Sequence, residues 1–274
     1  MKAWLRIFNR RERKERGDCA KNNLPLRLFA LLAVSAFLFS LAPAQKRTLF
    51  LIGDSTVKNG SGKGEGGLWG WGDFLAEQLD TSKLHIENHA RGGRSSRTYI
   101  AEGLWDGVLS KIKKGDIVII QFGHNDAGPV NDTIRARGTI KGIGEETEEI
   151  DNMITKKHEI VHTFGWYLRK YVQDTKAKGG IPVLCSRVAQ NNWTDGKVVR
   201  ATENYTLWTR QIAESEHVAF IHLNDLTATK YEQLGPDAVT SKLFLTDKTH
   251  TSLEGARITG GIVAGELKRL KILP

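Results

Sequence analysis

Cysteine is scarce in this chain of 274 residues, which holds only Cys19 and Cys185. Cys19 lies in an N-terminal part that we expect to be removed, so the mature chain would keep one cysteine and no intramolecular disulfide. A domain of this length can bury a core that is stable without a disulfide. Cys185 ends an apolar run and is expected to be a buried core thiol, not a nucleophile.

The N-terminal part also lacks an apolar run long enough for a comfortable membrane span. Its run, residues 28–41, has about 14 residues, whereas a spanning helix needs roughly 20. A basic segment precedes this run and small residues ending at Ala44 follow it, which is the order of an export signal. We predict a leader at 1–44, cleavage near Ala44, and one exported domain at 45–274 in the periplasm or outside the cell. A retained leader would instead anchor the chain to a membrane.

The net charge of +9 is concentrated in that leader. Residues 1–44 hold 9 of the 40 Lys and Arg residues and 3 of the 31 Asp and Glu residues, so 31 basic and 28 acidic residues remain in 45–274. This near balance argues against nucleic acid as a partner of the domain.

Short apolar runs alternate with amphipathic segments through the predicted domain, which is typical of βαβ units and a parallel sheet covered on both faces. We expect strands at 48–52, 84–88, 116–122, 181–187 and 218–223. We expect helices at 68–79, 99–112, 156–178, 199–217, 226–234 and 252–270. Residues 123–155 form a long irregular connection, which we interpret as a wall or lid over a substrate cleft.

Polar loops follow the first three predicted strands, at the sheet edge where α/β proteins place their ligands. The first loop carries Ser55, and the next two carry Gly93 and Asn125. Asp247 and His250 lie three residues apart just before the last predicted helix, so that their side chains can face the same way.

These residue types are those that acyl transfer requires. Ser55 would be the nucleophile, His250 its base and Asp247 the carboxylate that orients the imidazole, while Gly93 and Asn125 would supply N–H donors to the oxyanion. Each stretch also has an ordinary interpretation, because Gly-Asp-Ser is common in turns and His250 could simply help to cap a helix.

Taken together, the stretches resemble a known family. GDST (53–56), GGRS (92–95), FGHND (122–126) and DKTH (247–250) occur in the order of the four blocks of the SGNH (GDSL-type) hydrolases. Within that family the chain looks most like the rhamnogalacturonan acetylesterases, through the segments GDST, NHARGGRSSR and DKTHTS. The resemblance covers about residues 48–270.

The resemblance implies a flavodoxin-like three-layer α/β/α sandwich with five parallel strands. It implies a Ser55–His250–Asp247 triad and an oxyanion hole made by Ser55, Gly93 and Asn125. The doubled glycine at 92–93 permits a one-residue shift, and Gly93 is chosen because it directly precedes Arg94-Ser95. No metal and no organic cofactor is expected.

The activity that the resemblance implies is removal of O-acetyl groups from a plant cell-wall polysaccharide, most closely rhamnogalacturonan, by a monomeric enzyme. The alternatives are an SGNH esterase for acetyl-xylan, lipid or small acyl esters, and a glycan-binding protein that keeps the fold without turnover.

Two further motifs point to other chemistry but are incomplete. Residues 158–162 fit H-E-x-x-H, yet Leu168 occupies the position of the third histidine of the longer zinc pattern. The glycine pattern at 62–67 fits a dinucleotide fingerprint, but it begins about ten residues after the predicted strand. We therefore expect neither a catalytic zinc site nor an NAD site.

Substrate contacts are predicted at positions near the strand ends. Arg94 and Arg187 could pair with uronic-acid carboxylates, Trp193 could stack on a sugar ring, and His124 could shape the pocket beside Asn125. Asp54, next to the nucleophile, is also predicted as a substrate contact. Two other aromatic candidates, Trp69 and Trp71, are expected to serve mainly as core or scaffold, and a further arginine, Arg97, is expected to face solvent or to brace a loop.

Overall fold

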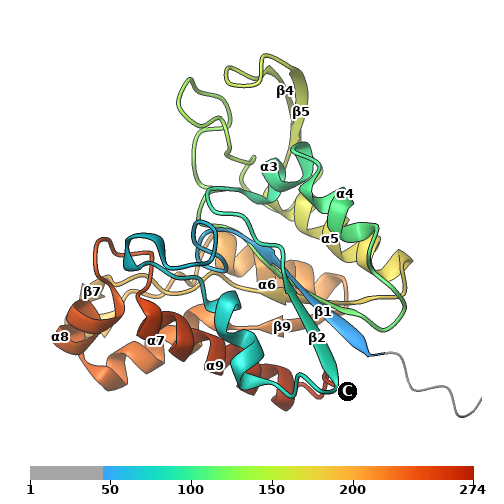
Figure 1. Ribbon diagram of the computed structural model, residues 1–274. Helices are drawn as coiled ribbons and strands as arrows, with labels where there is room; N and C mark the ends of the chain where they lie inside the picture. The colour runs from blue at the N-terminus through green and yellow to red at the C-terminus, as the bar shows by residue number, and fades with distance from the viewer. Residues whose placement is uncertain (1–45) are drawn as a thin grey trace, which may run out of the picture. The chain divides into compact units, whose positions relative to one another are not determined.

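Five parallel strands form the central sheet of the computed structural model, which describes residues 46–274 (Figure 1). Their spatial order is β2 (Leu84–Asn88), β1 (Arg47–Gly53), β3 (Ile117–Gln121), β6 (Ile181–Cys185) and β9 (Ala219–Ile221). This order reverses between β1 and β3, where doubly wound sheets open a ligand crevice. The prediction of a five-stranded parallel α/β/α sandwich is confirmed.

The predicted leader, 1–44, lies outside the described residues. Cleavage of the leader, export of the domain and the monomeric state therefore stay predictions.

The strands are apolar on both sides because each side meets a helical layer. Leu49 and Leu51 of β1 face one core, while Phe50 and Ile52 face the other, as the two-residue period of a strand requires. Cys185 is fully buried beside the first core, and burial raises the pKa of its thiol far above the usual range. The prediction of an inert core thiol at this position is confirmed.

The helices divide between the two faces of the sheet (Figure 1). One layer packs against Leu49 and Leu51; it consists of η2 (Trp71–Gln78), α7 (Leu223–Leu234) and α9 (Leu253–Arg269). The other layer consists of α3 (Ser96–Ala101), α4 (Leu104–Leu109), α5 (Phe164–Ala177) and α6 (Tyr205–Ser215). Apart from a hairpin described below, the remaining elements are η1 (Glu65–Gly67), β7 (Trp193–Thr194), β8 (Lys197–Val198), α8 (Pro236–Ala238) and η3 (Val239–Leu243).

Several helices are shorter than the sequence pattern predicts. The segment expected as one helix at 99–112 is two, divided at Gly103, whose φ of 71° is left-handed. The segment expected at 199–217 becomes helical only at Tyr205. No helix within residues 46–274 combines the length and apolarity that a membrane crossing requires.

The largest error concerns residues 156–178, which were expected to form one helix. Residues His158–His162 form strand β5, which pairs antiparallel with β4 (Thr147–Asp151), and α5 starts only at Phe164. Thr163 separates the two elements as the N-cap of α5, its side chain accepting a hydrogen bond from the Trp166 N–H. Apolar spacing alone could not locate this boundary, because a short exposed strand and a helix start share similar residues.

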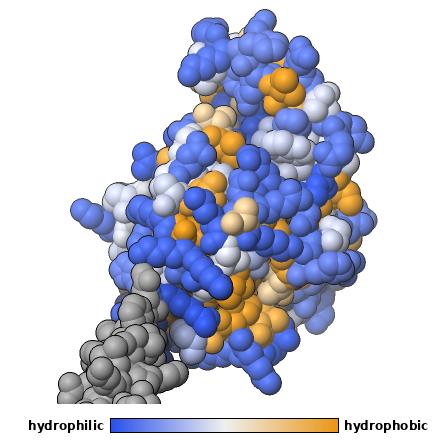
Figure 2. Space-filling view, turned by 90° about the vertical axis from the view of Figure 1, so that its right-hand side faces the viewer, coloured by the Kyte–Doolittle hydropathy of each residue, from blue (hydrophilic) through white to orange (hydrophobic). Residues whose placement is uncertain are grey.

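The β4–β5 hairpin projects from the sandwich above α3 (Figure 1), and this end of the molecule presents a mostly hydrophilic surface (Figure 2). The irregular connection that was expected over 123–155 therefore contains a strand of its own. Its other part, before β4, lies along α3 and reaches the carboxyl edge of the sheet, where Arg135 and Arg137 line a cleft. The interpretation of this connection as a wall of the cleft agrees with that placement.

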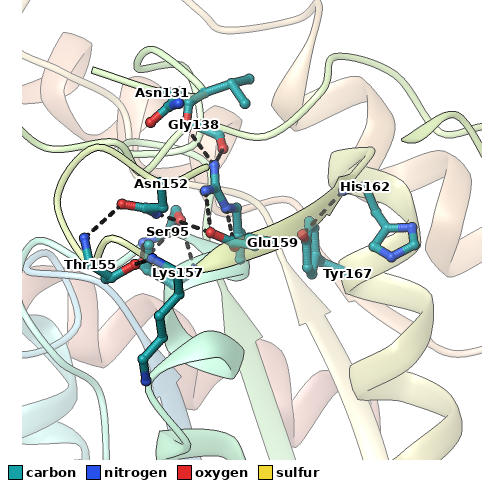
Figure 3. A network of polar contacts seen from close by, with 12 residues as sticks. Ser95, Asn131, Gly138, Asn152, Thr155, Lys157, Glu159, His162 and Tyr167 are labelled. Carbon is teal, nitrogen blue, oxygen red and sulfur yellow. Dashed lines mark hydrogen bonds and ion pairs between the residues drawn. The ribbon is translucent and has the colours of Figure 1, made fainter. Parts of the chain in front are cut away.

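Arg97 holds this connection together. Its side chain is 1% exposed, and its guanidinium donates to both carboxylate oxygens of Glu159 at 2.6 Å and to the carbonyls of Val130 and Gly138 at 2.7 and 2.8 Å. Figure 3 shows Gly138 and Glu159, from separate segments, meeting at this one polar centre. Of the two expectations for Arg97, the loop brace is confirmed and the solvent-facing position is wrong, because the side chain is buried among its acceptors.

Arg97→Met should strongly destabilise the domain, because it leaves a largely buried carboxylate and two carbonyls without their donor. The expected loss is about 3–5 kcal/mol in the free energy of unfolding, measured by urea denaturation. Arg94→Met is the matched control, since Arg94 forms a half-exposed pair with Glu102 and should cost no more than about 1 kcal/mol. Equal losses in the two variants would contradict this account of Arg97.

Candidate active site

The turn that carries Ser55 is fixed by a buried hydrogen-bond network at the end of β1. Asp54 Oδ1 accepts from the backbone N–H of Thr56 at 2.9 Å and from its hydroxyl at 2.8 Å. Gln121 at the end of β3 donates to the Thr56 hydroxyl at 2.6 Å, and Trp71 Nε1 donates to Gln121 Oε1 at 2.8 Å. The network joins two strands and η2, so the backbone around Ser55 has little freedom to move.

Close packing under this turn explains the glycine before it. A Cβ added at Gly53 would lie 2.6 Å from the carbonyl oxygen of Gln121 and 2.6 Å from Cγ2 of Val57. Any larger residue would push the turn away from β3, and Ser55 with it.

Ser55, His250 and Asp247 form a continuous hydrogen-bonded chain. The distance from Ser55 Oγ to His250 Nε2 is 2.8 Å, and that from His250 Nδ1 to Asp247 Oδ2 is 2.7 Å. Asp247 Oδ1 also accepts from the N–H groups of Thr249 and His250, at 2.6 and 2.7 Å. Burial raises the pKa of the Asp247 carboxyl, but these hydrogen bonds lower it by more, so the group is held ionised.

The loop carrying His250 is anchored by the two residues that follow the histidine. Trp69 N–H donates to the carbonyl of Thr251 at 2.9 Å, which ties the loop to the glycine-rich segment beside Ser55. Ser252 then caps α9, its hydroxyl accepting from the N–H of Gly255. The imidazole is thus placed by the start of a long packed helix, not by a free loop.

Ser55 and His250 line a cleft with a volume of about 510 Å³. The predicted oxyanion donors Gly93 and Asn125 line the same cleft. Gly93 has a φ of 79°, a left-handed conformation that favours glycine. Asn125 is 8% exposed, and its amide nitrogen donates one hydrogen to the Arg94 carbonyl at 2.8 Å, which leaves the second hydrogen for a ligand. Gly92 also lines the cleft, so both members of the glycine pair border it.

Asp126, which follows Asn125, was not singled out from the sequence but organises this region. Its carboxylate accepts from the N–H and hydroxyl of Ser96 at 2.9 and 2.5 Å and from the Gly123 N–H at 3.0 Å. Burial raises its pKa to about 6 despite these hydrogen bonds. Asp126 therefore binds the turn of Asn125 to the start of α3, and its place in the FGHND segment was the available signal.

His124 lies in the cleft wall, as predicted, and is held neutral. Burial lowers its pKa to about 4; the charge of Asp54 opposes this shift, and the neighbouring Arg187 guanidinium adds to it. A neutral buried imidazole shapes the pocket and does not carry a charge at neutral pH.

Arg187 lines the cleft, as predicted, together with two arginines that the sequence reasoning missed. These are Arg135 and Arg137, both in the irregular connection. Arg137 donates to the Gly93 carbonyl at 2.9 Å, and burial lowers its pKa. Two arginines separated by a single residue were a usable signal, but no pattern placed that segment at the cleft.

Three of the predicted substrate contacts are not among the residues that line the cleft. Asp54 is 0% exposed and bonds to Thr56, so it supports the nucleophile turn and does not touch a ligand. Arg94 is paired with Glu102 and is not among the residues that line the cleft. Trp193 donates to Asn191 at 2.7 Å, and its ring is partly buried against a small core beside the β7–β8 hairpin.

The two incomplete motifs have structural uses. His158 and His162 lie on a strand, and Glu159 between them pairs with Arg97, so the helical spacing that the zinc motif needs is not present. Among the described residues, no three His, Cys, Asp or Glu side chains are grouped so that they could hold a metal ion. The glycines at 62–67 lie in a turn-rich loop with η1, in which Gly64 packs against the ring of Trp69.

The sequence profile of the GDSL-like lipase/acylhydrolase family matches residues 51–258. The chain belongs to this family. It is 32% identical over 221 residues to a rhamnogalacturonan acetylesterase of Emericella nidulans, covering 80% of this chain and 84% of the relative. It is 28% identical over 227 residues to the probable rhamnogalacturonan acetylesterase YesY of Bacillus subtilis, covering 81% and 93%. The predicted family resemblance is confirmed.

Solved structures show the same fold. Protein YxiM of Bacillus subtilis superposes with a TM-score of 0.66 at 24% identity, and the match covers 84% of this chain and 58% of YxiM. The acetylxylan esterase Axe2 of Geobacillus stearothermophilus superposes with a TM-score of 0.53 at 20% identity, covering 81% of this chain and 93% of Axe2.

The burial of His124 predicts an unusual titration. Its ring resonances should change with a midpoint near pH 4 in long-range proton–nitrogen NMR spectra, assigned by their loss in His124→Asn. Because an unfolded histidine titrates near 6.5, the folded state should also lose stability as the pH falls from about 6.5 to about 4. A ring midpoint near 6.5 would contradict the buried, neutral state.

Proposed function

We propose that this protein is a serine esterase that removes O-acetyl groups from a plant cell-wall polysaccharide. The observation that carries the proposal is the chain of two hydrogen bonds, 2.8 and 2.7 Å long, that joins Ser55, His250 and Asp247. A hydroxyl, an imidazole and a carboxylate in this order are what nucleophilic acyl transfer requires.

In the proposed reaction, Ser55 Oγ attacks the acetyl carbonyl while His250 Nε2 takes its proton. Asp247 holds the Nδ1–H tautomer and stabilises the imidazolium that forms. The oxyanion accepts hydrogen bonds from the N–H groups of Ser55 and Gly93 and from the free amide hydrogen of Asn125. Collapse expels the sugar alkoxide, which His250 protonates, and water then hydrolyses the acetyl-enzyme with His250 as base.

For the polysaccharide we propose rhamnogalacturonan. Two relatives are similar to this chain over most of their length, at 32% and 28% identity. The first is named a rhamnogalacturonan acetylesterase and the second a probable one. The cleft independently favours an acidic polymer, since Arg135, Arg137 and Arg187 all line it and guanidinium groups bind carboxylates well. Galacturonic acid residues carry such carboxylates, whereas the backbone of xylan is neutral.

Ser55→Ala should lower acetate release from acetylated rhamnogalacturonan by more than about 10³-fold, because the nucleophile is lost. Ser110→Ala, which changes an exposed serine at the end of α4, is the matched control and should keep full activity. Wild-type enzyme should release acetate faster from acetylated rhamnogalacturonan than from acetylated xylan or p-nitrophenyl acetate.

The outcomes separate the alternatives. Retained activity in Ser55→Ala would contradict the esterase mechanism. Faster release from acetylated xylan would keep the mechanism but overturn the substrate, and no release from any ester with retained oligosaccharide binding would leave a glycan-binding protein.

A further inference from the structure

A second cavity lies beside the cleft, between α3 and the β4–β5 hairpin. This hairpin cavity has a volume of about 260 Å³, and its lining includes Thr98, Glu102, Arg135, Asn152, Lys157 and Glu159. Arg135 also lines the cleft that contains Ser55, so the two hollows adjoin at this side chain. The two hollows are therefore neighbours on the surface, with Arg135 common to both.

The two acids of the hairpin cavity are already neutralised within the protein. Glu102 pairs with Arg94 at 2.9 Å, and Glu159 pairs with Arg97 at 2.6 Å. Asn152 is occupied as well, since its amide donates to Glu159 and its carbonyl oxygen accepts two backbone N–H groups. These groups build the wall and offer little to a ligand.

Two cations of the same cavity have no such partner. Within residues 46–274, neither Arg135 nor Lys157 has an acidic side chain within ion-pair distance, and both are exposed. Figure 3 shows the Lys157 side chain extending away from the hydrogen bonds that fix its neighbours. The hairpin cavity therefore presents uncompensated positive charge to solvent, and an anionic group is the ligand that complements it.

The backbone that carries these cations is held in place before any ligand arrives. Arg97 binds the carbonyls of Val130 and Gly138, on either side of Arg135, and it binds Glu159 two residues after Lys157. Asp132 Oδ1 further accepts from the Arg135 N–H at 2.6 Å. Fixed positions reduce the ordering cost of binding.

We propose that the hairpin cavity is a second sugar subsite, which binds a carboxylate-bearing residue of the same polysaccharide chain whose acetyl group lies at Ser55. The inference rests on the proposed function and extends it, because it assigns recognition of the acidic polymer to a site remote from the reacting ester. Lys157 is the discriminating residue, since it lines the hairpin cavity and not the cleft.

The test is binding of a de-acetylated rhamnogalacturonan oligosaccharide to the Ser55→Ala enzyme, measured by isothermal titration calorimetry at low salt. Adding Lys157→Gln should raise Kd about two- to five-fold, the size of an exposed ion pair, and the difference should shrink in high salt. Lys178→Gln is the matched control: Lys178 is an exposed lysine at the end of α5, and its removal should leave Kd unchanged.

A carboxyl-reduced oligosaccharide should bind equally to the parent and to the Lys157→Gln variant. An unchanged Kd in Lys157→Gln, an equal weakening on the reduced oligosaccharide, or no binding to the parent would overturn the subsite. Because no ester is cleaved in this assay, its failure is distinct from failure of the proposed function, which wild-type acetate release reads out separately.

Discussion

The hydrogen bonds from Gln121 to Thr56, and from Thr56 to Asp54, are the interactions on which the rest of the site depends. They fasten the end of β1 to the end of β3 in the dry interior, at the one place where the strand order of the sheet reverses. Trp71 completes the network from the helical layer behind it. A nucleophile attached to so constrained a turn needs no further ordering when a substrate binds.

The remaining parts of the site come from independent segments that the sheet brings to one edge. Asn125 follows β3, Gly93 follows β2, and His250 precedes α9, so each is placed by the end of a packed element. The proposed catalytic geometry is thus a consequence of parallel strand order, and the irregular connection adds the charged wall that carries Arg135 and Arg137. The irregular connection has few apolar residues with which to form a hydrophobic core. Arg97 holds it together instead, through hydrogen bonds to Glu159, Val130 and Gly138.

The sheet and the triad could be predicted from the sequence because their signals are local. A buried strand such as residues 117–121 is a continuous apolar run, and the segments around Ser55 and His250 match the ordered blocks of one family. Gln121, the polar exception in this run, was not singled out from the sequence, although it belongs to the network that holds the turn of Ser55. The predictions that failed depend on contacts distant in sequence. Residues 158–162 form a strand whose Glu159 pairs with Arg97, and Asp54 is buried under the turn of Ser55, where it accepts hydrogen bonds from Thr56.

The central claim is that Ser55 becomes acetylated during turnover. Rapid quenching of the enzyme with excess acetylated oligosaccharide, followed by peptide mass spectrometry, tests it most directly. The account predicts one added acetyl group on the peptide that contains Ser55, and none in Ser55→Ala under the same conditions. An acetyl group found on another residue, or acetate release at the full rate without an acetylated Ser55 peptide at any quench time, would contradict it.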